Sequence, residues 1–312
     1  MIDDELKNLI NEFLASGTPF AVVRLPGEQP RIIGLGSQEG LKITPWLGGR
    51  FSKDVQNHTD PSQYLEQLEA LIALLNKTGG KTVLSRIIGV DVSHVDWADA
   101  AEALWSAFPQ SFGYLISSDK WGGWLGASPE TLLVVRPDGE IYTHALAGTV
   151  GLDENWDEKN KKEQRIVGDY IADKLDKNGI NYTKGETFDL IYGGIKHLCT
   201  PFIGHLPDNF SPQKLLENLA PTPALAGYPL EDALSMIKKL EKHSRGLYGG
   251  YITIVNSEVS YSFVTIRCVQ FDLVTGKGAV YVGSGITADS EPLKELEETD
   301  RKARVLLDIL IN

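Results

Sequence analysis

The sequence lacks the features that several classes of protein require. Its 312 residues include no apolar stretch of about 18 residues, so we expect no membrane-spanning segment. The first residues, Met1-Ile2-Asp3-Asp4-Glu5, are acidic where a signal peptide carries positive charge, which predicts a cytoplasmic protein. A formal net charge of -12 argues against a duplex nucleic-acid partner, because such a partner normally requires a basic stripe.

Cysteine is also scarce. Cys199 and Cys268 lie within apolar, strand-like runs, with no Cys-x-x-Cys pair and no histidine at metal-ligand spacing. We therefore expect both to be small core residues, and we expect neither a disulfide framework nor a zinc site.

The order of hydrophobic patterns predicts an α+β fold with large, mainly antiparallel sheets wrapped by helices. Apolar residues at helical spacing predict helices over 6–14, 60–78, 97–108, 153–177, 212–218, 230–242 and 292–310. Apolar runs between turn residues predict strands over 19–24, 31–35, 81–90, 112–116, 122–126, 132–135, 141–145, 188–192, 195–203, 250–255, 260–271 and 278–282. The last three should form a meander. No repeat or linker divides the chain, so we expect one domain over 1–312, with a short lead-in at 1–62.

The last predicted helix carries two carboxylates and an amine on one face. Glu295, Glu298 and Lys302 are spaced i, i+3 and i+7. On a solvated helix this pattern is an ordinary ladder of ion pairs. The preceding Gly283-Ser284-Gly285 lies where the strand gives way to the helix, and it is either a tight turn or a place where backbone N–H groups approach an anion.

Another carboxylate, Glu163, lies in a basic part of the helix over 153–177. Magnesium is held by a few protein carboxylates and takes substrate oxygens and waters in its other positions, so Glu163 and Glu298 would suit Mg²⁺. Spacing alone does not show that the two helices meet.

Six separated blocks of sequence resemble the signatures of the chorismate-binding enzymes and occur in that family's order between about residue 63 and the C-terminus. The blocks are Gly126–Glu130 (GASPE), 146–149 (LAGT), 219–229 (LAPTPALAGYP), 245–250 (RGLYGG), 265–267 (TIR), and 283–286 (GSGI) with Ser290, Glu295, Glu298, Thr299 and Lys302. The resemblance implies an α+β fold, chorismate as substrate and Mg²⁺ as cofactor, with Glu163, Glu295 and Glu298 holding the metal.

Three positions of these blocks favour isochorismate synthase within the family. The resemblance makes Lys81 a general base for water, where ammonia-using members typically carry glutamine. Ala147 stands where aminodeoxychorismate synthases often carry a nucleophilic lysine, and an alanine cannot form that covalent bond. Glu130 matches the family's general acid. Without the resemblance, Lys81 would be a solvated strand end and Glu130 part of a Ser-Pro-Glu turn.

The resemblance also implies the substrate-binding residues, the partners and the pathway. The residues are Gly148, Thr149, His197, Tyr248, Arg267, Gly283, Ser284, Gly285 and Lys302. Arg267 and the Tyr248 hydroxyl should take the pyruvyl carboxylate, and His197 either orients the ring carboxylate or is a structural histidine. We expect the protein to be a monomer that needs no glutamine amidotransferase subunit. We expect its product to serve menaquinone or siderophore biosynthesis.

The sequence departs from the family at two positions and leaves rival functions open. Asn160 replaces a frequent acidic residue and Gln164 a frequent histidine, which should weaken the outer support of the metal. The rivals are a salicylate synthase, which also eliminates pyruvate, an anthranilate synthase, and a homologue that binds chorismate without turnover.

Overall fold

Two antiparallel sheets carry the fold, in a computed structural model that describes residues 1–33, 40–49, 51–192, 194–255 and 259–311. The first sheet has the order β12 (Gly227–Tyr228), β4 (Lys81–Asp91), β16 (Lys277–Ile286), β15 (Cys268–Asp272), β6 (Gly122–Ser128), β5 (Phe112–Ser118), β1 (Phe20–Arg24) and β2 (Arg31–Ile33). The second has the order β10 (Phe188–Tyr192), β11 (Ile195–His205), β8 (Glu140–Gly151), β7 (Thr131–Val135), β14 (Ser260–Val264), β13 (Tyr251–Val255) and β3 (Leu41–Thr44), and β9 (Asn181–Lys184) pairs with β11.

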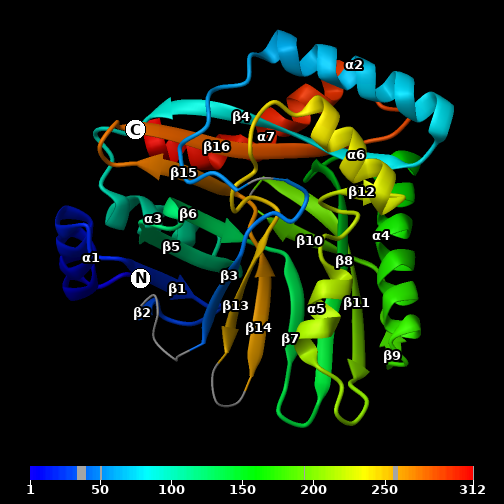
Figure 1. Cartoon of the computed structure of the whole chain (residues 1–312), viewed down its shortest axis with the longest axis horizontal. Coiled ribbons are helices and arrows are strands. Elements are labelled where there is room, and N and C mark those ends of the chain that lie inside the picture. The colour runs from blue at the N-terminus through cyan, green and yellow to red at the C-terminus, as the bar shows by residue number, and fades with distance from the viewer. Residues whose placement is uncertain (34–39, 50, 193, 256–258, 312) are drawn as a thin grey trace.

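Every strand pairing between described residues is antiparallel, which confirms the predicted α+β class. The helices around the sheets are α1 (Asp4–Ser16), α2 (Pro61–Thr78), α3 (Trp97–Ala107), α4 (Glu158–Lys177), α5 (Pro212–Leu219), α6 (Leu230–Leu240) and α7 (Pro292–Ile311). In Figure 1, α4 runs beside the second sheet and α2 lies along the β4 end of the first.

Strand β1 shows how the first sheet is buried on both faces. All five of its residues are buried, and alternate side chains of a strand point to opposite faces. Phe20 and Val22 join a core with α1, α3 and α7, whereas Ala21 and Val23 join a core with β13 and β14 of the second sheet. The first sheet is therefore a middle layer between helices and the second sheet.

Aspartates begin four of the helices. The side chains of Asp3, Asp60, Asp96 and Asp157 each accept a hydrogen bond from a backbone N–H in the first turn that follows. The cap at Asp157 corrects one prediction, because α4 begins at Glu158 and the stretch 153–157 precedes the helix. Its predicted end at Lys177 is confirmed.

The predicted strand over 260–271 is wrong in an informative way. It is two strands, β14 in the second sheet and β15 in the first, so the predicted meander does not form. The break falls at residues 265–267, where Arg267 has a φ of 52°, a left-handed conformation that an extended strand does not allow. The chain thereby crosses from one sheet to the other beside the cavity described below.

Smaller differences concern short segments. The prediction missed β3, β9 and β12, and the end of the predicted strand 31–35 lies outside the described residues. The lead-in pairs with both sheets, through β1 and β2 in one and β3 in the other. Cys199 and Cys268 are buried and unpaired, as expected. Among the described residues, no helix is both long and apolar enough to cross a bilayer.

We predict that Phe112→Ala lowers the free energy of unfolding by about 3–5 kcal/mol, because it removes a large buried ring between the sheets. Phe112 of β5 stacks on Phe263 of β14 with ring centroids 4.4 Å apart. Denaturant unfolding measures the change. Phe188→Ala, at a side chain that is 47% exposed on β10, is the control and should change stability by less than about 0.5 kcal/mol. Equal effects of the two variants would contradict the assigned core.

Candidate active site

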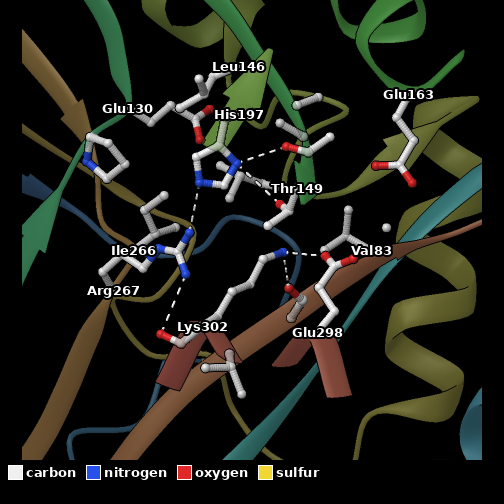
Figure 2. A pocket seen from close by; sticks show the side chains of 18 of the residues that line it. Val83, Glu130, Leu146, Thr149, Glu163, His197, Ile266, Arg267, Glu298 and Lys302 are labelled. Atoms are coloured by element: carbon white, nitrogen blue, oxygen red, sulfur yellow. Dashed lines mark hydrogen bonds and ion pairs between the residues drawn. The ribbon is translucent and has the colours of Figure 1, made fainter. Parts of the chain in front are cut away.

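A cavity with about 710 Å³ of empty space opens where strands of both sheets meet α4 and α7. Its walls carry ionisable groups from distant parts of the chain, as Figure 2 shows. The predicted residues on its walls are Lys81, Glu130, Gly148, Thr149, Glu163, His197, Tyr248, Arg267, Gly283, Gly285, Glu298 and Lys302. The structure thus gathers twelve of the fourteen predicted site residues around one space.

Lys81 is the first residue of β4 and its side chain is almost wholly buried. Its Nζ lies 3.4 Å from Oε2 of Glu163, which projects from α4. Gly285 of the neighbouring strand leaves the room for this pair, because a Cβ there would lie 2.6 Å from Cε of Lys81 and 2.9 Å from Oε2 of Glu163. The pair therefore places a buried amine at the cavity wall.

Glu130 lies between β6 and β7, in another part of the cavity wall. Burial raises the pKa of this carboxyl to about 7, although the positive charges of Lys81 and Arg267 oppose the rise. A carboxyl with this pKa can hold or release a proton near neutral pH. The cavity therefore presents both a buried amine and a carboxyl that can donate a proton.

A β-bulge shapes the opposite end of the cavity. Gly148 and Thr149 of β8 together face the single residue His197 of β11, and Gly148 has a φ of 75°, as the first residue of a glycine bulge often has. The bulge directs two acceptors at one ring nitrogen. Nδ1 of His197 lies 2.8 Å from the carbonyl oxygen of Gly148 and 3.2 Å from Oγ1 of Thr149.

His197 holds Arg267 in place. Nε2 of His197 is 3.0 Å from Nη2 of Arg267, and because a guanidinium only donates, Nε2 must accept and the Nδ1–H must donate to Gly148. Burial and the Arg267 charge lower the pKa of His197 to about 3, so the ring stays neutral. Both ring nitrogens are engaged within the protein, and this arrangement makes His197 a positioning residue for Arg267.

The guanidinium of Arg267 is the candidate anion-binding group. It stacks over the Tyr192 ring at 5.2 Å and faces the cavity. Among the residues that the structure describes, no carboxylate forms an ion pair with it, so its positive charge remains available to an anionic ligand. Tyr248, from the segment before β13, adds a hydroxyl-bearing ring to the same wall.

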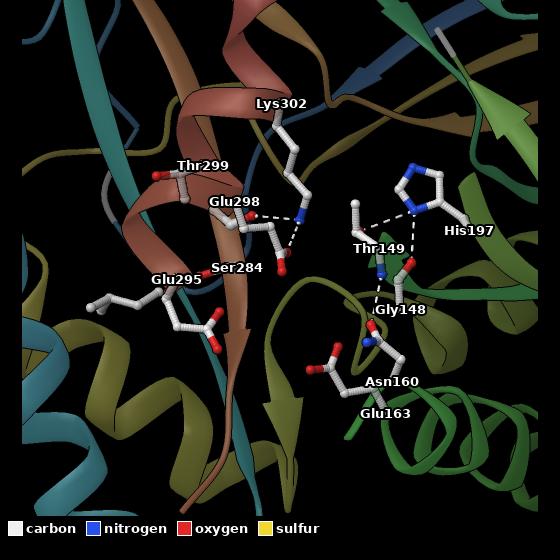
Figure 3. A network of polar contacts seen from close by, with 12 residues as sticks. Gly148, Thr149, Asn160, Glu163, His197, Ser284, Glu295, Glu298, Thr299 and Lys302 are labelled. Atoms are coloured by element: carbon white, nitrogen blue, oxygen red, sulfur yellow. Dashed lines mark hydrogen bonds and ion pairs between the residues drawn. The ribbon is translucent and has the colours of Figure 1, made fainter. Parts of the chain in front are cut away.

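The three predicted metal-binding carboxylates project from α4 and α7, and Figure 3 shows them with Lys302 beside Glu298. Lysines also engage Glu163 and Glu295. Nζ of Lys302 is 2.6 Å from Oε1 of Glu298 and 3.0 Å from the carbonyl oxygen of Gly283. Nζ of Lys159 is 3.5 Å from Oε1 of Glu163 and 2.5 Å from Oε1 of Glu295. The helices are thus joined by pairs of opposite charge.

The donor chemistry of this cluster fits Mg²⁺. Oε2 of Glu295 is buried and has no hydrogen-bond partner among the residues that the structure describes, and such an oxygen calls for a cation or a water. Burial raises the pKa of Glu295, whereas in Glu298 the positive charges of Lys302 and Lys159 outweigh burial and lower the pKa. Within the described residues, no three carboxylate, histidine or cysteine side chains already lie close enough to enclose an ion.

Two predicted residues lie off the cavity wall. Glu295 is buried behind it, against Lys159. The side chain of Ser284 occupies the other face of β16, where its Oγ is 3.5 Å from the hydroxyl of Tyr64 on α2. Ser284 can therefore meet a ligand only through its backbone.

Of the two alternatives for Gly283–Gly285, the tight turn is wrong, because these residues belong to β16 and pair with β4. Strand β15 pairs with β16 only as far as Tyr281, so the second half of β16 has an open edge. The carbonyl of Gly283 points to Lys302 on that edge. Because the N–H and C=O of one strand residue share an edge, the N–H groups of Gly283 and Gly285 also lie there.

The two departures from the family pattern have structural roles. Oδ1 of Asn160 accepts a hydrogen bond from the N–H of Thr149 at 2.9 Å, and its Nδ2 donates to the helix cap Asp157 at 2.7 Å. A carboxylate at position 160 could not make the second bond. Nε2 of Gln164 donates to the carbonyl of Ala145 and to Oγ1 of Thr200. Both amides tie α4 to strands of the second sheet.

Lys159 is the site residue that the sequence interpretation missed. In the sequence, Lys159 is one of several basic residues around Glu163. Its i, i+4 spacing to Glu163 could have indicated the ion pair between the two side chains. Its contact with Glu295 joins residues 136 positions apart, and no local pattern contains that information.

The sequence pattern of one protein family, described as "Chorismate binding enzyme", matches residues 49–311. Isochorismate synthase MenF of Bacillus subtilis (strain 168) is 32% identical over 217 residues, which are 64% of this chain and 45% of that protein. Isochorismate synthase EntC of Escherichia coli (strain K12) is 32% identical over 274 residues, which are 82% of this chain and 69% of that protein. The chain thus spans about half the length of the first relative and two thirds of the second.

Among solved structures, the menaquinone-specific isochorismate synthase MenF from Escherichia coli superposes with a TM-score of 0.73. The match covers 89% of this chain and 65% of that one, at 24% sequence identity. At this identity the likeness establishes the shared fold.

We predict that Glu130 makes stability depend on pH. The native carboxyl, with its pKa raised from 4.5 to about 7, binds a proton more tightly than the unfolded chain does. The wild type should therefore lose stability relative to Glu130→Gln as the pH rises from about 4.5 to 7, by roughly 3 kcal/mol at most. Urea unfolding of both proteins at pH 4.5, 6 and 8 measures the difference. A difference that does not change with pH would contradict the assigned environment.

Proposed function

Because the chain belongs to the family of chorismate-binding enzymes, we propose that it is an Mg²⁺-dependent isochorismate synthase. The reaction adds water to C2 of the chorismate ring and expels the hydroxyl of C4 as water, with the double bonds shifting between them. No oxidant, reductant or second substrate is consumed. The activity needs one base, one acid and a means of holding a dianionic ring.

The observation that carries the proposal is the placement of Lys81 and Glu130 in one cavity. Lys81 supplies a buried amine, and Glu130 supplies a buried carboxyl with a pKa of about 7. General acid–base catalysis works best when the donor's pKa lies near the working pH, because the group is then both protonated and ready to release its proton. A pocket that only binds an anion needs no such carboxyl.

The substrate would bind at the end of the cavity that holds Arg267. Among the described residues, no carboxylate forms an ion pair with this guanidinium. Arg267, held by His197, can receive the pyruvyl carboxylate through two parallel hydrogen bonds. The Tyr248 hydroxyl and the backbone N–H groups of Gly283 and Gly285 are further donors on that side. The ring then extends toward Glu130 and Lys81.

In the proposed mechanism, Lys81 first releases its ammonium proton to solvent, and as the free amine it then accepts a proton from the water that forms the new C2–O bond. Glu130 gives its proton to the oxygen at C4 as the C4–O bond breaks, and that oxygen leaves as water. The two groups act on opposite faces of the ring. Solvent protonation of Glu130 then restores the starting state, so the step is balanced without another reactant.

The carboxylates between α4 and α7 would hold the cofactor. Glu163 and Glu298 would bind Mg²⁺ directly, and Glu295, whose Oε2 lacks a partner, would hold its waters. When bound, the metal would neutralise the ring carboxylate of the substrate. Lys302, paired with Glu298, lies beside the same carboxylates and limits their net negative charge.

We predict that the purified protein converts chorismate to isochorismate when Mg²⁺ is added, and that EDTA stops the reaction. Chromatography with mass and absorbance detection identifies the product. Salicylate with pyruvate would instead show a salicylate synthase, and anthranilate formed with ammonium would show an anthranilate synthase. Binding of chorismate without any product would show a non-catalytic homologue.

We predict that Lys81→Ala reduces kcat by about 10²–10⁴-fold but leaves chorismate affinity within a few-fold, because the amine acts on water and not on a substrate carboxylate. Initial rates give kcat, and calorimetric titration gives the affinity. Lys277→Ala removes an exposed lysine from the start of the adjacent strand β16 and is the matched control. Near-normal turnover in Lys81→Ala would eliminate Lys81 as the base.

A further inference from the structure

Lys159 occupies an unusual position for a lysine. Its side chain is only 22% exposed, and its ammonium contacts two of the three carboxylates assigned to the metal. Glu163 lies one helical turn further along α4, and Glu295 lies on α7, so Lys159 spans the two helices. The ammonium of a lysine is a compact charge on a flexible chain of four carbons, so it can move between the two carboxylates and the solvent.

The other two lysines of the cavity are engaged differently. Lys302 also donates to the backbone of Gly283, and Lys81 is fixed in β4 with its stem against Gly285. Within the described part of the chain, the ammonium of Lys159 contacts only carboxylates, and Lys159 is more exposed than Lys81. Among these three, it is the cation that can withdraw toward solvent with the least disturbance.

We propose that Lys159 is a tethered counter-ion that competes with the divalent cation. Its ammonium neutralises Glu163 and Glu295 in the metal-free protein, and it would withdraw when Mg²⁺ binds Glu163 and the waters of the metal bind Glu295. The carboxylates thereby remain close together without a metal, which their mutual repulsion would otherwise oppose. This inference rests on the metal ligands of the proposed function.

The proposal has two measurable consequences. If the ammonium lies in the cluster about nine-tenths of the time, only a tenth of the protein is ready to bind metal, and removing the ammonium should raise Mg²⁺ affinity about tenfold. The metal-free protein should also become less stable, because the carboxylates lose their counter-ion. Added Mg²⁺ should restore that stability.

The test compares Lys159→Met with Lys162→Met in calorimetric titrations with MgCl₂ and in thermal unfolding with EDTA or MgCl₂. Both variants remove one charge from α4, but Lys162 is 53% exposed and its recorded partner, Asp289, is 3.9 Å away and exposed. We expect about tenfold tighter Mg²⁺ binding, a lower metal-free Tm and a larger rise in Tm with Mg²⁺ for Lys159→Met alone. Lys159→Arg, which keeps the charge, should behave like the wild type.

Unchanged or weaker Mg²⁺ binding by folded Lys159→Met would overturn the proposal and leave Lys159 as a structural ion pair. Should that variant not fold, Lys159→Gln keeps an N–H donor for Glu295 and is titrated in the same way. Failure of both to fold even with MgCl₂ would also contradict the proposal. None of these readouts requires turnover, so they stand apart from the assay for isochorismate.

Discussion

Charge balance in and behind the cavity wall is the constraint on which the rest of the site depends. Lys81, Glu163, Lys159 and Glu295 form a continuous series of opposite charges, and Lys302 pairs with Glu298 beside it. Loss of one partner from a buried pair costs about 3–5 kcal/mol, because the remaining charge stays away from water. Each buried charge of the cluster therefore needs an opposite charge beside it. These ion pairs join α4 to α7 and gather the carboxylates that are proposed to hold the metal.

The opposite end of the cavity depends on backbone conformation instead of charge pairs. Gly148, with a φ of 75°, forms the bulge opposite His197. Arg267, with a φ of 52°, lies where the chain leaves the second sheet and enters the first. A non-glycine residue in this region costs of the order of 1–2 kcal/mol, which the surrounding contacts must offset. The result is a guanidinium held by a neutral histidine and directed at the ligand. One end of the cavity thus suits a metal and the other a carboxylate, with acid and base between them.

Local patterns predicted most of the helices and strands. An element buried on one face has apolar residues at a regular spacing, and a strand buried on both faces is a continuous apolar run. They failed at residues 265–267, since hydrophobicity does not reveal that a continuous apolar run changes sheets. They failed at Gly283 and Gly285 too, because glycines that make room for Lys81, Glu163 and Tyr248 look the same as glycines of a turn. Residue spacing alone could not predict that Glu163 and Glu298 lie at the same cavity. The family resemblance supplied that link, and only the structure revealed the part of Lys159.

The central claim is that the cavity directs a molecule of solvent water to C2 while the C4 oxygen departs. Turnover of chorismate with Mg²⁺ in water enriched in ¹⁸O, followed by mass spectrometry of isochorismate after a short reaction, tests this claim most directly. We expect one ¹⁸O atom in each product molecule, at the new C2 hydroxyl. Isochorismate without the label would show that the hydroxyl migrates within the substrate and would contradict the assigned base and acid.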